Sequence, residues 1–462
     1  MRDPSATSPN RAFPECTPPH GNLSADPAKS HRLAPFAERD SGLATESSHS
    51  RGITIAHVRP ILPRRPTAIV HTGRQLALLR GGLGSAAVRL LRNAAGLRVA
   101  PSTEFARGFL RTPLAPGEGV LFQRLGAALL YADPEQSRAL TARAGAPVLM
   151  LQPERYVRAH SLQDITTCSG DPPQLLSDTP YATWGLEATR TLSSRYTGAG
   201  VRVAILDTGL DLGHPDFAGR TILAQSFVAE RPVEDVNGHG TFCAGVACGP
   251  KVPSQGPRYG VACAADLCIA KVLNDDAGGI DGNVLAGIEW AVRNDCAVIC
   301  LSLGSPVALG DSYPEVYEHV AARALAAGSL LIAPAGNESQ RPDTIAPVEH
   351  PANCPSVVAI GALDRSLTVA SFSNGGLNPD GGEVDLAAPG ICISSAAPRP
   401  ALYQSGSGTS MAAPFAAGIA ALLAEADLFA RGARLRDLLL TSFRTLPDPP
   451  RDVGAGLVQA PQ

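Results

Sequence analysis

Residues 201–209 read Val-Arg-Val-Ala-Ile-Leu-Asp-Thr-Gly, a nearly continuous apolar run that ends in an acidic residue and a glycine. A short run of this kind, without strict alternation, predicts a strand that is buried on both faces. Asp207 would then stand at the carboxyl end of the strand, where open α/β sheets collect their functional groups. An aspartate after a strand is also a common structural cap, so this stretch indicates a fold class before it indicates a function.

Similar runs recur through the second half of the chain, separated by stretches with helical spacing. The further predicted strands are Leu267–Leu273, Val298–Leu303, Ser329–Pro334, Val357–Ile360 and Val384–Leu386. The predicted helices include Asn283–Arg293 and Tyr313–Ala327. This alternation predicts an α/β fold, a three-layer α/β/α sandwich with a mostly parallel central sheet.

The chain divides into four predicted regions. Residues 1–52 are rich in Pro, Ser and Arg without apolar periodicity, which predicts disorder. Residues 53–160 form a predicted small α+β domain, residues 161–180 a polar linker, and residues 181–462 the α/β domain. The small domain's predicted elements are a helix over Ser85–Ala95, a strand over Val120–Ala132, a helix that Asp133 caps and that runs to about Arg143, and a strand over Val148–Val157.

Composition bounds the possible functions. The 462 residues have a net charge of −3, with 44% hydrophobic and 18% charged residues, which is ordinary for a globular protein and excludes a strongly basic nucleic-acid binder. No apolar run reaches the roughly 18 residues that a membrane span needs, so we expect no membrane partner. Residues 1–160 nevertheless carry a net charge of +10 and residues 161–462 one of −13. The two halves could attract each other, or the basic half could simply have an Arg-rich, solvated surface.

The ten cysteines include no Cys-x-x-Cys pair, which disfavours zinc-ribbon and thioredoxin-like readings. Their pairing and the redox compartment stay open. The first 20 residues lack the apolar stretch of a secretory signal. We therefore expect a cytoplasmic location or export by another route, unless the true start of the chain lies elsewhere.

Two further motifs follow Asp207. His239 lies between two glycines in Asn237–Thr241, and Ser410 lies within Gly406–Pro414 at the start of an Ala-rich helix. Taken singly, a Gly-flanked histidine is often incidental, and a serine there is ordinarily an N-cap. The small residues around Ser410 would, however, let a substrate backbone reach its hydroxyl.

In the order Asp, His, Ser the three motifs resemble those of the subtilisin-like serine peptidases, the subtilases, over about residues 175–460. Further matching stretches are Ser302-Leu303-Gly304, Ala335-Gly336-Asn337 and Gly454-Ala455-Gly456-Leu457-Val458. The resemblance implies a serine-type endopeptidase, a hydrolase that acts on protein or peptide substrates. It also implies the triad Asp207, His239 and Ser410 as catalytic residues.

The chemistry of these residues fits that interpretation. A serine hydroxyl is a weak nucleophile until a base removes its proton, and His239 is suited to do so near neutral pH. Asp207 would hold the imidazole and stabilise the imidazolium. The side chain of Asn337 could form an oxyanion hole with the Ser410 backbone N–H, although a plain turn residue is the alternative for Asn337.

The resemblance also implies substrate-binding residues. Ser302, Leu303 and Gly304 would form a strand edge that pairs with an extended peptide, and they would wall the first specificity pocket together with Gly336. Val298–Leu303 also fits an ordinary buried strand, and both interpretations can hold.

In subtilases the residue two before the proline that matches Pro351 lies near the floor of this pocket, so the resemblance implies Glu349 at the floor and Glu338 near the rim. Two carboxylates in a partly dry pocket predict a preference for Arg or Lys before the scissile bond, and Arg158 is a suitable residue to place there. The alternative is a loop shifted by a residue or more, with Glu349 facing water.

No metal or other cofactor is expected. Residues 249–259 lack the Asn-rich loop that binds calcium in secreted bacterial subtilisins. The position of Cys243, close in sequence to His239, indicates helix packing more than chemistry.

The region from about residue 66 to residue 160 resembles, more loosely, a subtilase propeptide, which assists folding and then inhibits until it is cleaved. The sequence thus predicts a monomeric, self-processing zymogen whose own pro-domain is an intramolecular inhibitor. Two alternatives remain: a dedicated intracellular peptidase that matures one precursor, and a non-catalytic binding protein that kept the fold.

Overall fold

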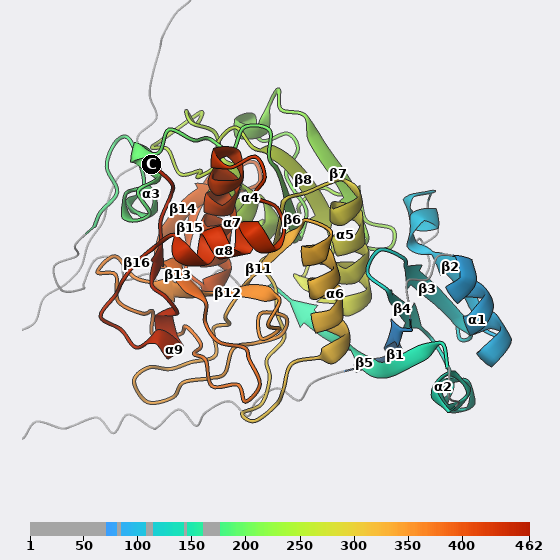
Figure 1. The fold of residues 1–462 in the computed structure, drawn as a ribbon. Coiled ribbons are helices and arrows are strands. Elements are labelled where there is room, and N and C mark those ends of the chain that lie inside the picture. The colour runs from blue at the N-terminus through green and yellow to red at the C-terminus, as the bar shows by residue number, and fades with distance from the viewer. Residues whose placement is uncertain (1–70, 81–84, 108–113, 143–145, 160–175) are drawn as a thin grey trace, which may run out of the picture. The chain divides into compact units, whose positions relative to one another are not determined.

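The computed structural model describes residues 71–80, 85–107, 114–142, 146–159 and 176–462 (Figure 1). All described residues belong to one compact unit. The segment predicted to be disordered, residues 1–52, lies outside the described residues. The predicted domain boundaries stay predictions.

The large sheet has nine strands in the order β16-β17-β13-β12-β11-β10-β6-β8-β7. Its strands are β6 (Arg202–Asp207), β7 (Ile222–Ser226), β8 (Asp266–Lys271), β10 (Val298–Leu301), β11 (Leu330–Pro334), β12 (Val357–Leu363), β13 (Leu386–Pro389), β16 (Phe443–Arg444) and β17 (Leu457–Val458). Only the pairing of β16 with β17 is antiparallel. The predicted α/β class with a mostly parallel central sheet is confirmed.

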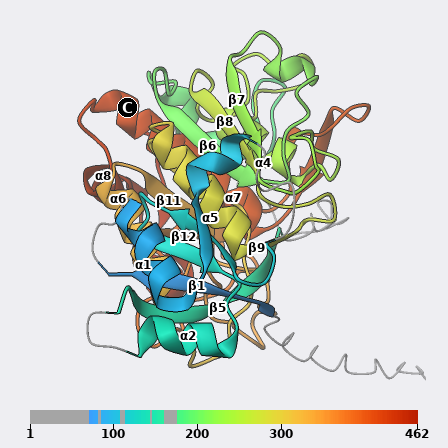
Figure 2. The same cartoon turned by 90° about the vertical axis from the view of Figure 1, so that its right-hand side faces the viewer.

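Helices cover both faces of this sheet, which explains the continuous apolar character of its strands. In β6, Val203 and Ile205 belong to one core cluster, whereas Ala204 and Leu206 belong to another. Helices α4 (His239–Cys248) and α7 (Thr409–Ala426) fill the first cluster, and α5 (Asp281–Arg293) and α6 (Glu315–Ala326) fill the second. Figures 1 and 2 show α5 and α6 side by side.

The expectation that no apolar run reaches the length of a membrane span needs correction at helix α7. It is 18 residues long and, by length and composition only, apolar enough to cross a membrane. In the structure 89% of that window is buried, because α7 packs against α4 and against the strands of the large sheet. Its apolar character is therefore that of a core helix.

Five strands of the N-terminal region form a second sheet together with β9 of the α/β domain, in the order β2-β3-β4-β1-β5-β9. Its strands are β1 (His71–Leu79), β2 (Arg98–Pro101), β3 (Glu118–Phe122), β4 (Ala127–Leu130), β5 (Val148–Arg158) and β9 (Gly278–Ile280). Helices α1 (Ser85–Ala95) and α2 (Pro134–Thr141) pack on one face, and residues of α5 and α6 pack on the other. The predicted capping of α2 is present, because the Asp133 carboxylate accepts from the backbone N–H groups of Glu135 and Gln136.

Two features of this region differ from the prediction. The stretch Val120–Ala132 was expected as one strand, but it is the hairpin β3–β4, whose turn contains Gly126 at φ +66°. Strands β1 and β2 were not predicted. The apolar residues on both sides of the turn hid the turn from a prediction based on hydrophobicity.

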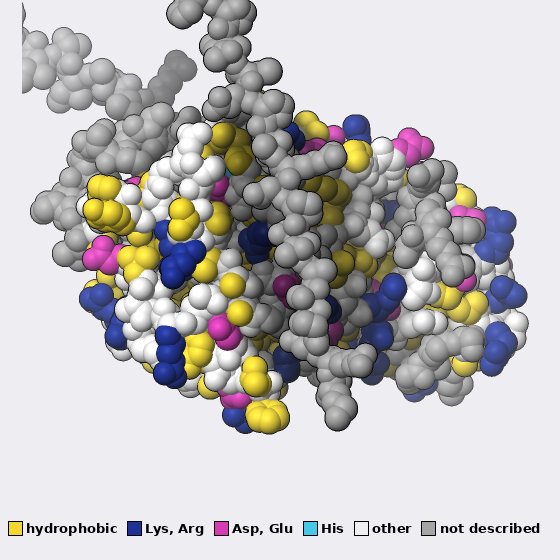
Figure 3. Space-filling view, turned by 90° about the horizontal axis from the view of Figure 1, so that it is seen from above, with side chains coloured by type: hydrophobic (Ala, Val, Ile, Leu, Met, Phe, Trp, Pro, Cys, Tyr) yellow, Lys and Arg dark blue, Asp and Glu magenta, His cyan; other side chains and the backbone are white. Residues whose placement is uncertain are grey.

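Several short elements complete the described part of the chain. They are α3 (Trp184–Ala188), α8 (Ala433–Thr441), α9 (Pro450–Val453), the hairpin of β14 (Ile393–Ala396) and β15 (Tyr403–Gly406), and the 3₁₀ turns Ser102–Arg107, Thr191–Ser193 and Pro215–Phe217. On the face shown in Figure 3, the coloured Lys and Arg side chains stand singly or in small groups, with acidic and apolar side chains between them.

Most described cysteines are free thiols. They are Cys243, Cys248, Cys263, Cys268, Cys296, Cys300 and Cys354, whereas Cys392 is disulfide-bonded.

Candidate active site

The end of β6 and the start of α4 bring two candidate catalytic residues together. Asp207 is the last residue of β6 and His239 the first of α4, and both side chains are buried. Nδ1 of His239 lies 2.9 Å from each carboxylate oxygen of Asp207. A glycine is required beside this contact, because a Cβ on Gly240 would stand 2.3 Å from the carbonyl oxygen of Gly209. The contact between the Asp207 carboxylate and Nδ1 holds the imidazole ring of His239 in place and leaves Nε2 as its reactive nitrogen.

Residues that the sequence analysis missed hold this pair in place. Asp235 accepts hydrogen bonds from the hydroxyls of Thr208 (2.9 Å) and Thr241 (2.7 Å), which flank Asp207 and His239 in sequence. The buried ammonium of Lys271 donates to the carbonyl oxygen of Thr208 and to Asp275. Thr208 and Thr241 could have indicated a shared hydrogen-bond acceptor from the sequence. That acceptor, Asp235, lies outside both motifs, so the sequence analysis did not identify it.

The electrostatic surroundings of His239 favour its protonated form. Burial by itself would lower the pKa of His239, but the charge and hydrogen bond of Asp207, with a smaller contribution from Asp235, raise the pKa above its ordinary value of 6.5. A histidine with these neighbours is a stronger base than a free one.

Ser410 and Asn337 come from two other elements. Ser410 is the second residue of α7, and Asn337 follows β11. Oδ1 of Asn337 accepts hydrogen bonds from the backbone N–H (2.9 Å) and the hydroxyl (2.8 Å) of Thr409, which orients its Nδ2. A Cβ on Gly408 would lie 3.5 Å from that Nδ2 and 3.8 Å from the backbone nitrogen of Ser410. Two N–H donors therefore border the same small space.

Three polar atoms of these residues are buried without a hydrogen-bond partner among the described residues. They are Nε2 of His239, Oγ of Ser410 and Nδ2 of Asn337. Buried polar groups without partners are rare in proteins, and they mark places where function outweighs stability. Their coincidence in one site is what a base, a nucleophile and an oxyanion donor would show.

Cys243 packs directly against this site. Its Sγ lies 3.7 Å from Nδ1 of His239 and 3.6 Å from the carbonyl oxygen of Ser410, so it bridges α4 and α7. Burial and then the charge of Asp207 raise the pKa of the thiol well above its ordinary value. Among the described residues, Asp207, His239 and Cys243 have donor atoms within 4.8 Å of one another, a spacing that could hold a metal ion. The protonated thiol and the Asp207–His239 hydrogen bond favour a packing role for Cys243.

The predicted strand edge is present after β10. Gly304 exchanges two backbone hydrogen bonds with Arg158, each 2.9 Å, so the end of β5 pairs with it as an extended peptide would. Ser302 and Leu303 are fully buried, and Gly336 donates its N–H to the hydroxyl of Thr409 at 3.2 Å. One expectation is wrong: the side chain of Arg158 is exposed, because its backbone occupies the edge at Gly304.

Glu349 does not face water, in contrast to the shifted-loop alternative. Its side chain is fully buried, and its backbone N–H donates to the carbonyl oxygen of Ala335 at 3.0 Å. Burial first, and then the charge of Glu338, raise the pKa of Glu349 well above its ordinary value. Glu338 therefore lies close enough for its charge to act on Glu349.

The segment without the Asn-rich loop is held by one buried carboxylate. Asp216 accepts hydrogen bonds from the backbone N–H of Ser254 (2.6 Å) and the hydroxyl of Tyr259 (2.7 Å). Because these bonds already order the segment, we expect a chelator to change the melting temperature little. A thermal melt with and without EDTA measures this, and a large loss that calcium restores would contradict it.

Comparison with known proteins agrees with this geometry. Residues 198–456 match the subtilase family, which is more than half of the chain. Subtilisin E of Bacillus subtilis (strain 168) is 36% identical over 262 residues, which are 56% of this chain and 65% of that protein, so the match spans just under two thirds of this relative. Subtilisin of Bacillus pumilus is also 36% identical over 262 residues, 56% of this chain and 90% of that protein.

One solved structure extends the comparison to the fold. The crystal structure of a cold adapted subtilisin-like serine proteinase matches with a TM-score of 0.50 and 29% sequence identity, and it covers 61% of this chain and 99% of that one. The matched family region contains Asp207, His239 and Ser410. The chain belongs to the subtilase family.

Proposed function

We propose that the chain is a serine endopeptidase that hydrolyses peptide bonds through an acyl-enzyme on Ser410. The observation that carries this proposal is the Asp207–His239 pair, which Cys243 connects to Ser410, together with the buried hydroxyl of Ser410 and the amide Nδ2 of Asn337, both without a hydrogen-bond partner among the described residues. The subtilase family and its relatives support it.

The steps follow from these atoms. Oγ of Ser410 attacks the substrate carbonyl carbon while Nε2 of His239 takes the hydroxyl proton, and Asp207 accepts from Nδ1–H throughout. Nδ2 of Asn337 and the N–H of Ser410 stabilise the oxyanion of the tetrahedral intermediate. Its collapse breaks the C–N bond, and the imidazolium passes its proton to the leaving amine. Water, deprotonated by His239, then releases the acid product and restores the serine.

The direction of the His239 pKa gives a testable pH profile. The base must be neutral to act, so kcat/KM is expected to fall as the pH drops through a value above 6.5, the ordinary histidine value. Removing the Asp207 charge in Asp207→Asn removes the main cause that raises this pKa, so the acid limb of the residual activity should move to lower pH. An acid limb centred below 6.5 in the native enzyme would contradict the assignment.

We further propose that the chain is made as a zymogen, inhibited by the domain that contains β1–β5. Support comes from the end of β5, which pairs with β9 and with Gly304, while the N–H of Ala159 donates to the carbonyl oxygen of Ala277 at 3.0 Å. These bonds pair the backbone of β5 with Gly304 and β9, and we propose that a substrate uses the same edge. A substrate peptide would have to displace it.

The same strand caps two helices of the α/β domain. Glu154 accepts from the N–H of Gly282 in the first turn of α5 (2.9 Å), and Gln152 accepts from Val316 in the first turn of α6 (2.8 Å). A carboxylate at a helix N-terminus is stabilised by the unpaired N–H groups and by the helix dipole. These caps support a role of the small domain in folding α5 and α6.

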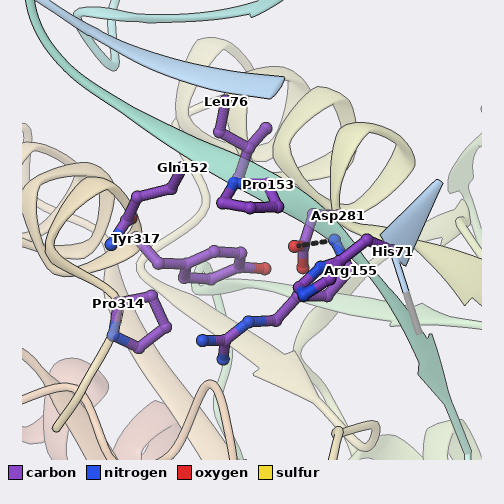
Figure 4. Close-up of a pocket in the computed structure, with 8 residues that line it drawn as sticks. All are labelled: His71, Leu76, Gln152, Pro153, Arg155, Asp281, Pro314 and Tyr317. Atoms are coloured by element: carbon purple, nitrogen blue, oxygen red, sulfur yellow. Dashed lines mark hydrogen bonds between the residues drawn. The ribbon is translucent and has the colours of Figure 1, made fainter. Parts of the chain in front are cut away.

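The contact between the small N-terminal domain and helices α5 and α6 of the α/β domain is not perfectly packed. A cavity of about 220 Å³ lies between β1, β5 and the starts of α5 and α6, and Figure 4 shows Arg155, Asp281 and Tyr317 among the residues that line it. The backbone N–H of Arg155 donates to Asp281 at 2.9 Å, but Nη1 of Arg155 and Oη of Tyr317 are buried without a partner among the described residues. Each unpartnered group costs about 1–3 kcal/mol, which favours eventual release of the small domain.

Two alternatives are separated from this proposal by experiment. A fluorophosphonate probe that labels the purified protein at Ser410 excludes the non-catalytic binding protein. Profiling on a peptide library separates a broad endopeptidase from a dedicated maturation peptidase, which would cleave few sequences.

A further inference from the structure

Asp235 is a buried carboxylate that the proposed catalytic steps do not use, and its hydrogen bonds converge on both sides of the catalytic pair. Its Oδ1 accepts from the hydroxyl of Thr208 (2.9 Å) and from the backbone N–H of Gly238 (2.8 Å). Its Oδ2 accepts from the backbone N–H (2.8 Å) and the hydroxyl (2.7 Å) of Thr241. One carboxylate therefore joins the residue that follows β6 to the first turn of α4.

Thr208 connects the two members of the pair a second time. Its backbone N–H donates to Oδ1 of Asp207 at 2.6 Å, and its hydroxyl accepts from the N–H of Gly240, the residue after His239, at 2.9 Å. Because the same hydroxyl donates to Asp235, a displacement of Asp235 would reach both the carboxylate and the helix that carries the imidazole. The contact between Asp207 and His239 depends on this relation.

A buried ammonium group completes the network from the neighbouring strand. Lys271 ends β8, lies opposite Asp207 in the register of β6 and β8, and has a fully buried side chain. Its Nζ donates to the carbonyl oxygens of Thr208 and Glu234 and to the carboxylate of Asp275. Three acceptors match the three donors of a compact ammonium, whereas a planar guanidinium would present five. The chain has only three lysines among its 39 basic residues, and this site holds one of them.

The charges of this network are balanced around His239. Asp207, Asp235 and Lys271 are all buried and together carry one net negative charge. The other titratable groups close to them are neutral or paired: Cys243 as a protonated thiol, Asp275 with Lys271 and Arg231, and Asp211 with Arg399. The buried set thus becomes neutral when the imidazole takes up a proton, the state that an acyl transfer creates in its transition state.

We propose that Asp235 and Lys271 are positioning residues, which hold His239 against Asp207 and balance the charge that forms when the imidazole accepts the proton of Ser410. This inference rests on the proposed peptidase function and adds two residues that act through the catalytic pair.

The test changes the two opposite charges one at a time. Full-length Asp235→Asn and Lys271→Met, allowed to process themselves, are assayed on a peptide p-nitroanilide across the pH range, and active sites are counted by complete labelling with a fluorophosphonate probe. For Asp235→Asn we expect kcat per labelled site to fall by roughly 10², the effect of a small misplacement of a catalytic group, with KM nearly unchanged.

The acid limb of the pH profile should move in opposite directions in the two variants. Asp235→Asn removes a carboxylate that raises the pKa of His239, so its acid limb should move to lower pH. Lys271→Met removes a positive charge from the same surroundings, so its acid limb should move to higher pH. A network that only stabilised the fold would reduce the number of labelled sites and leave both kcat per site and the acid limb at their native values.

Matched controls use the same substitutions at exposed positions. Asp437→Asn in α8 and Lys251→Met should keep the native kcat and acid limb. A milder pair decides the question if the buried variants do not fold. Thr241→Val removes the hydroxyl that donates to Asp235 and should lower kcat per labelled site, whereas Thr241→Ser keeps this donor and should restore it.

The outcomes separate this inference from the proposed function. A labelled Asp235→Asn enzyme with native kcat and acid limb, or acid limbs that move in the same direction in both charge variants, overturns the positioning role and leaves the peptidase function intact. Equal kcat values in Thr241→Val and Thr241→Ser do the same. An unchanged chain that neither binds the probe nor cleaves any peptide overturns the peptidase function as well.

Discussion

Purified Ser410→Ala should remain full-length, whereas the unchanged chain should cut itself between about Tyr156 and Asp178. Removing Oγ removes the nucleophile, and water alone has no comparable route to the acyl intermediate. The structure narrows the expected position, because Tyr156 to Arg158 are paired in the backbone with β9, so the cut is expected on the C-terminal side of Ala159. Gel electrophoresis and N-terminal sequencing of the product measure both results.

The matched control is Ser405→Ala, an exposed serine of β15 in the same stretch of chain, which should process normally. Adding a trace of unchanged enzyme to Ser410→Ala should cut it at the same bond, which shows that the variant is folded and lacks only the nucleophile. Normal processing of purified Ser410→Ala by itself would rule out the self-processing zymogen.

Replacing Asn337 by Leu should lower kcat by roughly 10²–10³ with little change in KM, the loss typical of one oxyanion-hole donor. The donor Nδ2 stabilises a charge that exists only in the transition state, so ground-state binding should be almost unaffected. Steady-state kinetics on a small peptide substrate separate kcat from KM.

Asn337 has a second role, which needs its own control. Its Oδ1 accepts two hydrogen bonds from Thr409, the residue before Ser410, so Leu also removes these. Thr409→Val keeps the backbone bond to Oδ1 of Asn337 and removes the two bonds of the hydroxyl, one to Oδ1 of Asn337 and one from the N–H of Gly336, and it should cost much less than Asn337→Leu. Equal losses in the two variants would make Asn337 a positioning residue for α7, and an unchanged kcat in folded Asn337→Leu would remove it from the mechanism.

Local sequence predicted much of the fold because both faces of the large sheet are covered. Strand β10 is apolar along its whole length and β6 is apolar between Arg202 and Asp207, so their positions are visible without knowledge of their neighbours. Edge strand β7 is partly exposed and was missed, since its residues show neither continuous burial nor clear alternation. The hairpin β3–β4 was predicted as one strand because apolar strands lie on both sides of its short turn, residues 123–126.

The sequence by itself determined the class of the fold, the order Asp207, His239, Ser410 and the presence of an amide at Asn337, because each of these lies in a short, self-contained motif. Only the tertiary structure decided which other residues contact these motifs. Asp235 reaches the threonines beside two of them, and Cys243 joins the helices that carry His239 and Ser410.

Tertiary structure also decided which charges meet at the substrate edge. Arg158 contributes its backbone to the edge at Gly304 and turns its side chain to solvent, whereas Glu349 is buried behind the same glycine. Sequence spacing cannot fix such outcomes, because they depend on the register between segments that lie far apart in the chain. The register is set by backbone pairing and packing across the whole domain, and one residue of slip would exchange the buried and exposed faces of a strand.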